Sequence, residues 1–204
     1  EKVTSSDVSN QANPYLTARW IDINGARVLA QRVSYIGELG WELYVPVDRA
    51  LPVWDLLYAA GQEFGLEVGG YKVLDSLRLE KGYRYFTADV TPMEDPYSAG
   101  LGFCVDLNKG DFIGRQALVE KKAAGLKHKL CTLVLDGEDF QTIYGGEAVY
   151  LDGKVVSRVR SGGYGFTLQR NIVYAYLPPE LAKIGTRLDV DVFDAVHKAE
   201  VAPT

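Results

Sequence analysis

The sequence predicts an α+β chain in which a mixed part, residues 1–125, is followed by an all-β part, residues 126–204. Alternating apolar residues surround an Asn24-Gly25 pair, and helix-period patterns fill several later stretches up to Gly125. Beyond Gly125 the apolar residues come in short runs separated by turn residues, which is typical of strands. A chain of 204 residues lies near the size at which one domain divides into two. We therefore predict a domain boundary near residue 125.

The first predicted element is a β-hairpin over residues 19–33. Asn-Gly between two alternating runs is the strongest short-range hairpin signal, so Asn24-Gly25 is its predicted turn. Gly37 and Gly40 then bracket a tight turn, because glycine adopts turn conformations without steric cost. A further strand is predicted over residues 41–45.

Three helices are predicted in the first part. Asp48 is the expected cap of the first, which ends near Gly65. Its apolar residues share one face at helical spacing: Leu51, Trp54, Leu57 and Tyr58. The second helix covers residues 71–81 and stops at Gly82, and the third covers residues 114–124. Between them, residues 83–110 form a long loop rich in Gly, Pro and Asp, a kind of segment that often carries function.

The second part is predicted to be a small barrel or sandwich. Its six short strands cover residues 130–135, 148–151, 154–160, 172–177, 188–193 and 199–201. We interpret Ser161-Gly162-Gly163 as a turn between two of them. The run to Gly165 resembles a phosphate-binding loop only superficially, because no helix with a Lys and a Ser or Thr follows it.

Composition excludes several partners. The net charge of −5, without a block of Lys and Arg, argues against binding nucleic acid or an anionic membrane surface. Apolar runs such as residues 130–135 are far too short to span a bilayer. Cys104 and Cys131, with His128 and His197, are too few for a zinc site or a disulfide framework, so we expect no metal. A reducing compartment fits: the cytoplasm, or the mitochondrial matrix in a eukaryote.

The segment 32–46 holds the best candidate chemistry. Tyr35, Glu38, Trp41 and Glu42 gather around its turn, where side chains can converge on a small planar ligand. A carboxylate buried in an aromatic strand needs a partner, and a pterin or purine edge offers adjacent N–H donors. The alternative is that Glu42 simply lies on the solvent face of an alternating strand. Among other charged residues, Arg78 is interpreted as a structural ion-pair partner.

Four blocks of the sequence resemble the glycine-cleavage T-protein (aminomethyltransferase) family, and most of all the folate-binding C-terminal half of dimethylglycine and sarcosine dehydrogenases and oxidases. They occur in the family's order and cover nearly the whole chain: YIGELGWELYVP; LDSLRLEKGYRYFTADVTPMEDPYSAGLGF; GDFIGRQAL; and GGYGFTLQRNIVYAYLP with RLDVDVFDAVHKAEVAP. The resemblance implies a partial T-protein-like folate-binding body over residues 1–125, followed by a small C-terminal antiparallel β-barrel domain over residues 126–204.

The resemblance also assigns site residues. It implies that Tyr35 lines a tetrahydrofolate pocket and that Glu42 binds the pterin ring. Glu38 and Glu94 match further family glutamates; Glu38 has the alternative of ordering its turn, and Glu94 that of a structural role. T-proteins carry an arginine where this chain has Leu74, and this departure favours the dimethylglycine and sarcosine branch. No catalytic residue is assigned, because the family's proton-handling aspartate lies upstream of the residues that match here.

The implied function is to hold tetrahydrofolate while a one-carbon unit is transferred to it from an N-methylated glycine. We expect the parent protein to be the enzyme and the 204-residue chain alone to be inactive, with FAD only in an N-terminal flavoprotein half. The expected partners are folate, the N-methylated amine, and the N-terminal region or flavoprotein half. Two alternatives stay open: an inactive folate-binding regulatory or scaffold module, and a folate-dependent demethylase of another methyl donor.

Overall fold

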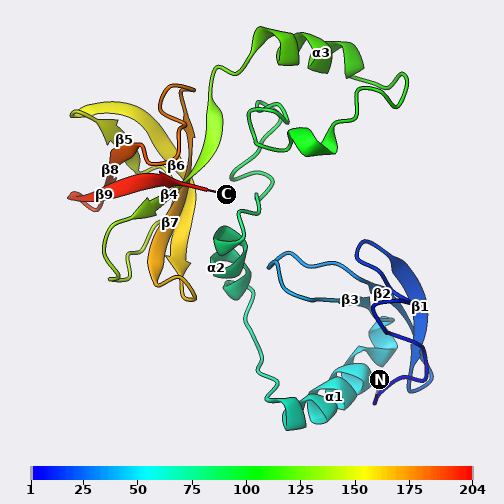
Figure 1. Ribbon diagram of the computed structural model, residues 1–204. Helices are drawn as coiled ribbons and strands as arrows, with labels where there is room; N and C mark the ends of the chain where they lie inside the picture. The colour runs from blue at the N-terminus through cyan, green and yellow to red at the C-terminus, as the bar shows by residue number, and fades with distance from the viewer. Residues whose placement is uncertain (1, 204) are drawn as a thin grey trace. The chain divides into compact units, whose positions relative to one another are not determined.

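The computed structural model describes residues 2–203 (Figure 1). The chain divides into two compact units, Glu1–Leu74 and Asp75–Thr204. Each unit is built around its own sheet. The predicted boundary near residue 125 stays a prediction.

The first unit pairs a small antiparallel sheet with one helix. Its strands follow the order β1-β2-β3: β1 (Ala18–Ile23), β2 (Ala26–Gln31) and β3 (Glu42–Tyr44). Helix α1 (Ala50–Gly61) lies between the 3-10 turns Val47–Arg49 and Gln62–Phe64. Asn24 and Gly25 both have positive φ, at 50° and 78°, which suits the tight hairpin turn predicted for them.

The core of this unit lies between the hairpin and α1. Its buried members alternate along β1 and β2 and meet one helix residue: Ile21, Ile23, Ala26, Val28, Ala30 and Val53. The predicted face of α1 is wrong in part. Leu57 packs against the core, but Leu51 and Trp54 are 68% and 52% exposed, because the helix turns Val53 toward the sheet instead. Asp48 makes no side-chain cap, and Arg49 occupies the N-cap position.

The second unit contains two helices and a closed barrel. Helix α2 (Val73–Glu80) begins at the unit boundary, and α3 (Arg115–Ala124) and the 3-10 turn Gly102–Cys104 follow. The barrel strands are β4 (Lys129–Leu135), β5 (Ala148–Leu151), β6 (Lys154–Gly165), β7 (Arg170–Leu177), β8 (Arg187–Val192) and β9 (Ala195–Ala202).

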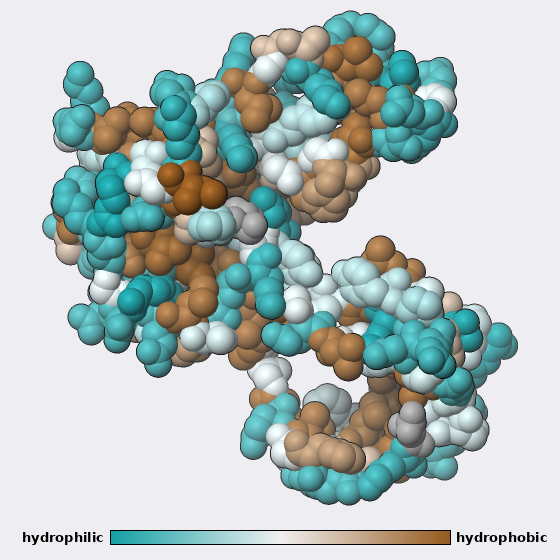
Figure 2. Space-filling view, viewed as in Figure 1, coloured by the Kyte–Doolittle hydropathy of each residue, from teal (hydrophilic) through white to brown (hydrophobic). Residues whose placement is uncertain are grey.

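All pairings in the barrel are antiparallel, and β9 returns to pair with β4 in the order β4-β7-β6-β5-β8-β9. The fold class predicted from the sequence is therefore confirmed, with a closed barrel rather than a sandwich. Every strand contributes buried residues to one core: among them are Leu133, Val149, Val159, Val173, Val190 and Val201. Apolar side chains also reach the surface (Figure 2). Among the exposed ones are Leu51 in the first unit and Phe193 in the second.

The predicted turn at Ser161-Gly162-Gly163 is wrong, because these residues continue strand β6. A Cβ added to Gly162 would lie 2.6 Å from Cγ2 of Ile143 and 2.8 Å from Cγ1 of Val173. The glycine therefore serves close packing inside a strand and not a bend.

Within residues 2–203 we find no helix that is both long enough and apolar enough to cross a bilayer.

Candidate functional site

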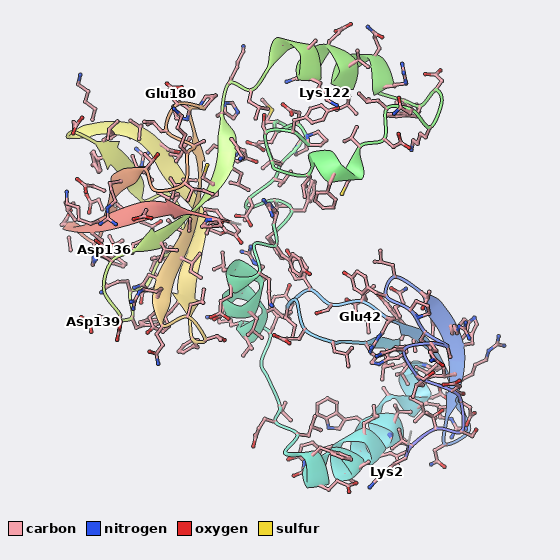
Figure 3. The ribbon with its side chains drawn as sticks, in the orientation of Figure 1. Lys2, Glu42, Lys122, Asp136, Asp139 and Glu180 are labelled. Carbon is pink, nitrogen blue, oxygen red and sulfur yellow. The ribbon has the colours of Figure 1, made fainter. Side chains whose placement is uncertain are left out.

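Glu42 begins β3 and lies on the outer face of the first unit's sheet (Figure 3). In the register with β2, Glu42 pairs with Gln31 and Leu43 with the fully buried Ala30. Because side chains alternate along a strand, Leu43 packs on the core while Glu42 and Tyr44 turn to the other face, where both are exposed. Glu42 thus has the exposure expected of a solvent-face residue, and this same exposure makes its carboxylate accessible to a ligand.

The Glu42 carboxylate keeps most of its hydrogen-bonding capacity. The hydroxyl of Tyr44 donates to its Oε2 at 2.9 Å. A carboxylate has about four acceptor positions, so one phenol leaves room for two further N–H donors. The same hydrogen bond restrains the Glu42 side chain.

The contact between Glu42 and Tyr44 gives a prediction. The hydrogen bond to Glu42 and the repulsion between its charge and a phenolate raise the pKa of Tyr44. In Glu42→Gln we expect the pKa of Tyr44 to fall toward the ordinary tyrosine value. Ring-labelled NMR titration of Tyr44 measures it, and an unchanged pKa would show that the contact does not persist in solution.

The turn before β3 positions the other two predicted residues of this segment. Gly37 has φ 73°, and a Cβ on Gly40 would lie 3.0 Å from the carbonyl oxygen of Val33, so both predicted glycines are required. Tyr35 is half-buried at the start of the turn, and Glu38 is exposed at its tip. Glu38 makes no ion pair among residues 2–203.

Glu94 belongs to the second unit, and its carboxylate is engaged on both oxygens. The backbone N–H and hydroxyl of Thr91 donate to Oε2 at 2.8 and 2.6 Å, and Arg160 pairs with Oε1. Its side chain is 9% exposed. This geometry orders the Thr91-Pro92-Met93 loop and ties it to strand β6.

Burial acts to raise the pKa of Glu94, but the Thr91 hydrogen bonds and the Arg160 charge outweigh it, so the pKa lies below the ordinary value. The carboxylate therefore stabilises the fold above the ordinary glutamate pKa, and this contribution is lost as the pH falls through the depressed folded-state value. We expect Glu94→Gln to be less stable than wild type at neutral pH and the difference to shrink in acid. Urea unfolding across this pH range measures it; a difference independent of pH would contradict the ionic role.

A cavity of about 400 Å³ adjoins Glu94 and is rich in cations and rings, including His128, Arg158, Arg160 and Tyr176. Arg160 stacks over the Tyr176 ring at 5.2 Å, and the His128 ring meets that ring edge-on at 5.5 Å. Burial, followed by the charge of Glu94, raises the pKa of Tyr176 to about 12, so this phenol stays protonated at physiological pH.

Arg78 is confirmed as a structural ion-pair partner. It is 3% exposed and donates to Oδ2 of the fully buried Asp89 at 2.7 Å, and to the more exposed Asp75 at 3.0 Å. Asp89 also accepts the backbone N–H of Tyr85 at 2.7 Å and the hydroxyl of Ser161. The pair thus joins α2, the following loop and β6.

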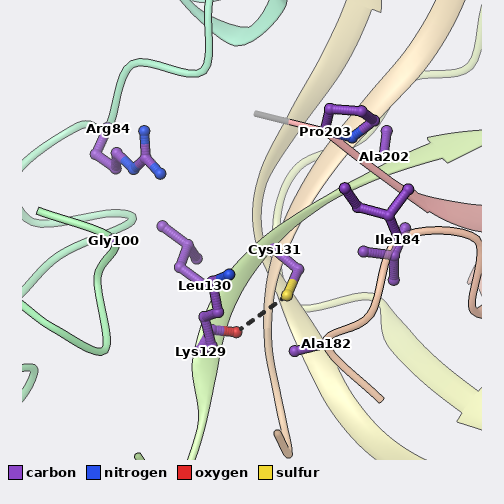
Figure 4. Close-up of a pocket in the computed structure, with 10 residues that line it drawn as sticks. Arg84, Gly100, Lys129, Leu130, Cys131, Ala182, Ile184, Ala202 and Pro203 are labelled. Atoms are coloured by element: carbon purple, nitrogen blue, oxygen red, sulfur yellow. Dashed lines mark hydrogen bonds between the residues drawn. The ribbon is translucent and has the colours of Figure 1, made fainter. Parts of the chain in front are cut away.

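A second cavity of about 400 Å³ lies against the barrel, between Arg84, Lys129 and Ile184 (Figure 4). Cys131 lines it, with its Sγ 3.4 Å from the carbonyl oxygen of Lys129. Burial raises the pKa of the Cys131 thiol, so little reactive thiolate forms at neutral pH.

The predicted site residues are thus divided between the units: Tyr35, Glu38 and Glu42 lie in the first, and Glu94 in the second. Tyr44 and Arg160 are not among the residues predicted from the sequence. The contact of Tyr44 with Glu42 is predictable, because residues two apart in a strand share a face. The contact of Arg160 with Glu94 is not, because 66 positions separate the two residues.

Family comparisons agree with the architecture and decide the family. The family profile described as "GCVT N-terminal domain" matches residues 1–109, which is more than half of the chain. A second profile, "Glycine cleavage T-protein C-terminal barrel domain", matches residues 128–204. The chain belongs to the glycine cleavage T-protein family.

Individual proteins similar to this chain extend this result. Human mitochondrial sarcosine dehydrogenase is 40% identical over 87% of the chain, and human mitochondrial dimethylglycine dehydrogenase is 36% identical over 98%. The chain spans only 19% and 23% of the length of these two proteins. The crystal structure of aminomethyltransferase T from Bartonella henselae shares the fold, with a TM-score of 0.81 at 24% identity, over 93% of this chain and 51% of that one.

Proposed function

We propose that this chain is the tetrahydrofolate-binding part of an aminomethyltransferase-like enzyme, which transfers a one-carbon unit from dimethylglycine or sarcosine to the folate. Two T-protein family profiles spanning both parts of the chain are the observation that carries the proposal. The identity to sarcosine and dimethylglycine dehydrogenases supports the substrate class. Both proteins are named as mitochondrial, which fits our expectation of the mitochondrial matrix in a eukaryote and the cytoplasm otherwise.

The side chains of the first unit offer hydrogen-bond acceptors that match the donors of a folate. The exposed carboxylate of Glu42, restrained by Tyr44, has acceptor positions left for the adjacent N–H donors of a pterin edge. Charge-assisted hydrogen bonds of this kind are about twice as strong as neutral ones. When bound, reduced folate supplies the nitrogen nucleophiles for the one-carbon unit. Glu42 and Tyr35 hold and orient the ring, and correct placement is a large part of such catalysis.

Glu38 and Glu94 take secondary parts in this proposal. Glu38 extends the negative surface at the tip of the turn. Glu94 has an indirect role: Thr91 and Arg160 occupy both of its carboxylate oxygens, so it positions these two residues. FAD belongs in the proposal only as the cofactor of a flavoprotein half that supplies the electrophilic one-carbon unit.

The test is turnover by the full-length protein with dimethylglycine or sarcosine, with and without tetrahydrofolate. We expect folate to capture the one-carbon unit that otherwise appears as formaldehyde. Folate binding without capture would identify an inactive binding or scaffold module. Capture from a different N-methylated amine, with neither of these two accepted, would identify a demethylase of another donor.

A further inference from the structure

The cavity of about 400 Å³ beside Glu94 carries an excess of positive charge. Its lining includes Lys127, His128, Arg158 and Arg160, and Glu94 supplies the one carboxylate among the described residues that line it. All of these residues belong to the second unit, so the cavity is complete within one compact body. A concave site with an excess of cations attracts anions from solution.

One wall of this cavity is held in place and is electrically neutral. The guanidinium of Arg160 pairs with Oε1 of Glu94 and stacks over the Tyr176 ring at 5.2 Å. The Tyr176 hydroxyl in turn donates to the carbonyl oxygen of Asp89 at 3.0 Å. Because Arg160 already has a counterion, the excess charge comes from the other cations of the lining.

Arg158 is a cation that the fold holds in place without neutralising it. Val159 turns into the barrel core, so Arg158 and Arg160 share the outer face of β6. Nη1 of Arg158 donates to the carbonyl oxygen of Gly146 at 2.9 Å, and no carboxylate within residues 2–203 forms an ion pair with it. A guanidinium has five N–H donors, so most of those on Arg158 remain available. The side chain is exposed, and a ligand can therefore reach it.

Lys127 and His128 reach the same cavity from the segment that precedes β4. The Lys127 ammonium makes no hydrogen bond or ion pair to any residue from 2 to 203, and the His128 ring contacts Tyr176 edge-on at 5.5 Å. Both residues are exposed. The cavity thus presents three accessible donor groups, and two of them, Lys127 and Arg158, carry a positive charge that no carboxylate of the described chain balances.

We propose that this cavity binds the phosphate group of a small phosphate monoester. A phosphate ester has three strong acceptor oxygens, which match the three donor groups in number, whereas a carboxylate has two oxygens. Its two negative charges balance Lys127 and Arg158. Arginine suits phosphate oxygens through its fork of N–H donors, and lysine as a point charge. The volume lies within the range of about 300–1,000 Å³ of small-molecule sites, which leaves room for an organic group beside the phosphate.

Titration with phosphates and carboxylates tests this site. Glycerol phosphate and inorganic phosphate are added to the 204-residue chain while the Arg158 Nε and His128 ring signals are followed by NMR. A pH of about 7.5 keeps the ester mostly dianionic, because its second pKa is about 6. Glutarate, which divides two charges between two carboxylates, and acetate are added at the same ionic strength. We expect both phosphates to shift the signals to saturation, and glutarate and acetate to bind at least about tenfold more weakly.

Three variants separate this site from general attraction of anions. Arg158→Gln should weaken binding of glycerol phosphate by about tenfold or more, because a charged donor is lost. Lys127→Gln should also weaken it, and this change removes no contact within residues 2–203, so a loss of affinity cannot come from a disturbed fold. Lys154→Gln removes the same charge from an exposed position of β6 outside the cavity. This matched control should bind like wild type.

Three outcomes would overturn the proposal: no saturable shift with either phosphate, binding of glutarate or acetate as tight as that of glycerol phosphate, or an equal loss of affinity in Lys154→Gln and Arg158→Gln. The titrations contain no folate and the site uses neither Tyr35 nor Glu42. Their result is therefore independent of the proposed function.

Discussion

Replacing Asp89 with alanine is expected to lower the free energy of unfolding by about 3–5 kcal/mol, because it removes the buried carboxylate that pairs with the buried Arg78 guanidinium. The backbone N–H of Tyr85 and the hydroxyl of Ser161 lose their acceptor in the same step. This is the largest stability effect that we expect from a single polar substitution in the second unit. Urea unfolding of the 204-residue chain measures it.

Asp75→Ala is the matched control, because it removes the other carboxylate that contacts Arg78. Asp75 is 56% exposed and its ion pair is screened by water, so a loss of about 1 kcal/mol or less is expected. Similar losses from the two variants would mean that burial of Asp89 does not strengthen its role, and the structural interpretation of Arg78 would fail.

Local patterns predicted the framework because the forces that form it act over short sequence distances. The alternation of Ile21, Ile23 and Val28 around Asn24-Gly25 predicts both the hairpin and which of its faces is buried. The barrel strands were likewise predicted to within a few residues, apart from the extension of β6 through Gly165.

Features that depend on tertiary contacts were not predictable in this way. The local sequence at Gly162 predicts a turn because nothing in it shows that Ile143 and Val173 crowd this residue. The face of α1 was misjudged because Leu51 and Trp54 fit the helical period as well as Val53 does. For the candidate site, the sequence marked Glu42, but the Arg160 partner of Glu94 appears only in the folded chain.

Replacing Glu42 with glutamine is expected to weaken binding of reduced folate by roughly 30- to 150-fold, or about 2–3 kcal/mol. The variant keeps the shape of the side chain but replaces one acceptor oxygen with a donor NH₂, which opposes the N–H groups of a pterin edge. Because Glu42 is exposed and Tyr44 is its one hydrogen-bond partner within residues 2–203, the fold should be unaffected. Weaker binding would therefore report the lost ligand contacts.

Calorimetric titration of tetrahydrofolate into the full-length protein and its Glu42→Gln variant tests the central claim most directly. Glu67→Gln, which makes the same change at another exposed position of the first unit, is the control for charge alone. We predict that the control binds like wild type and that Glu42→Gln loses affinity by the factor given above. Equal affinities in all three proteins would contradict the account, return Glu42 to the role of a solvent-facing strand residue, and direct the search to Glu38 and Glu94.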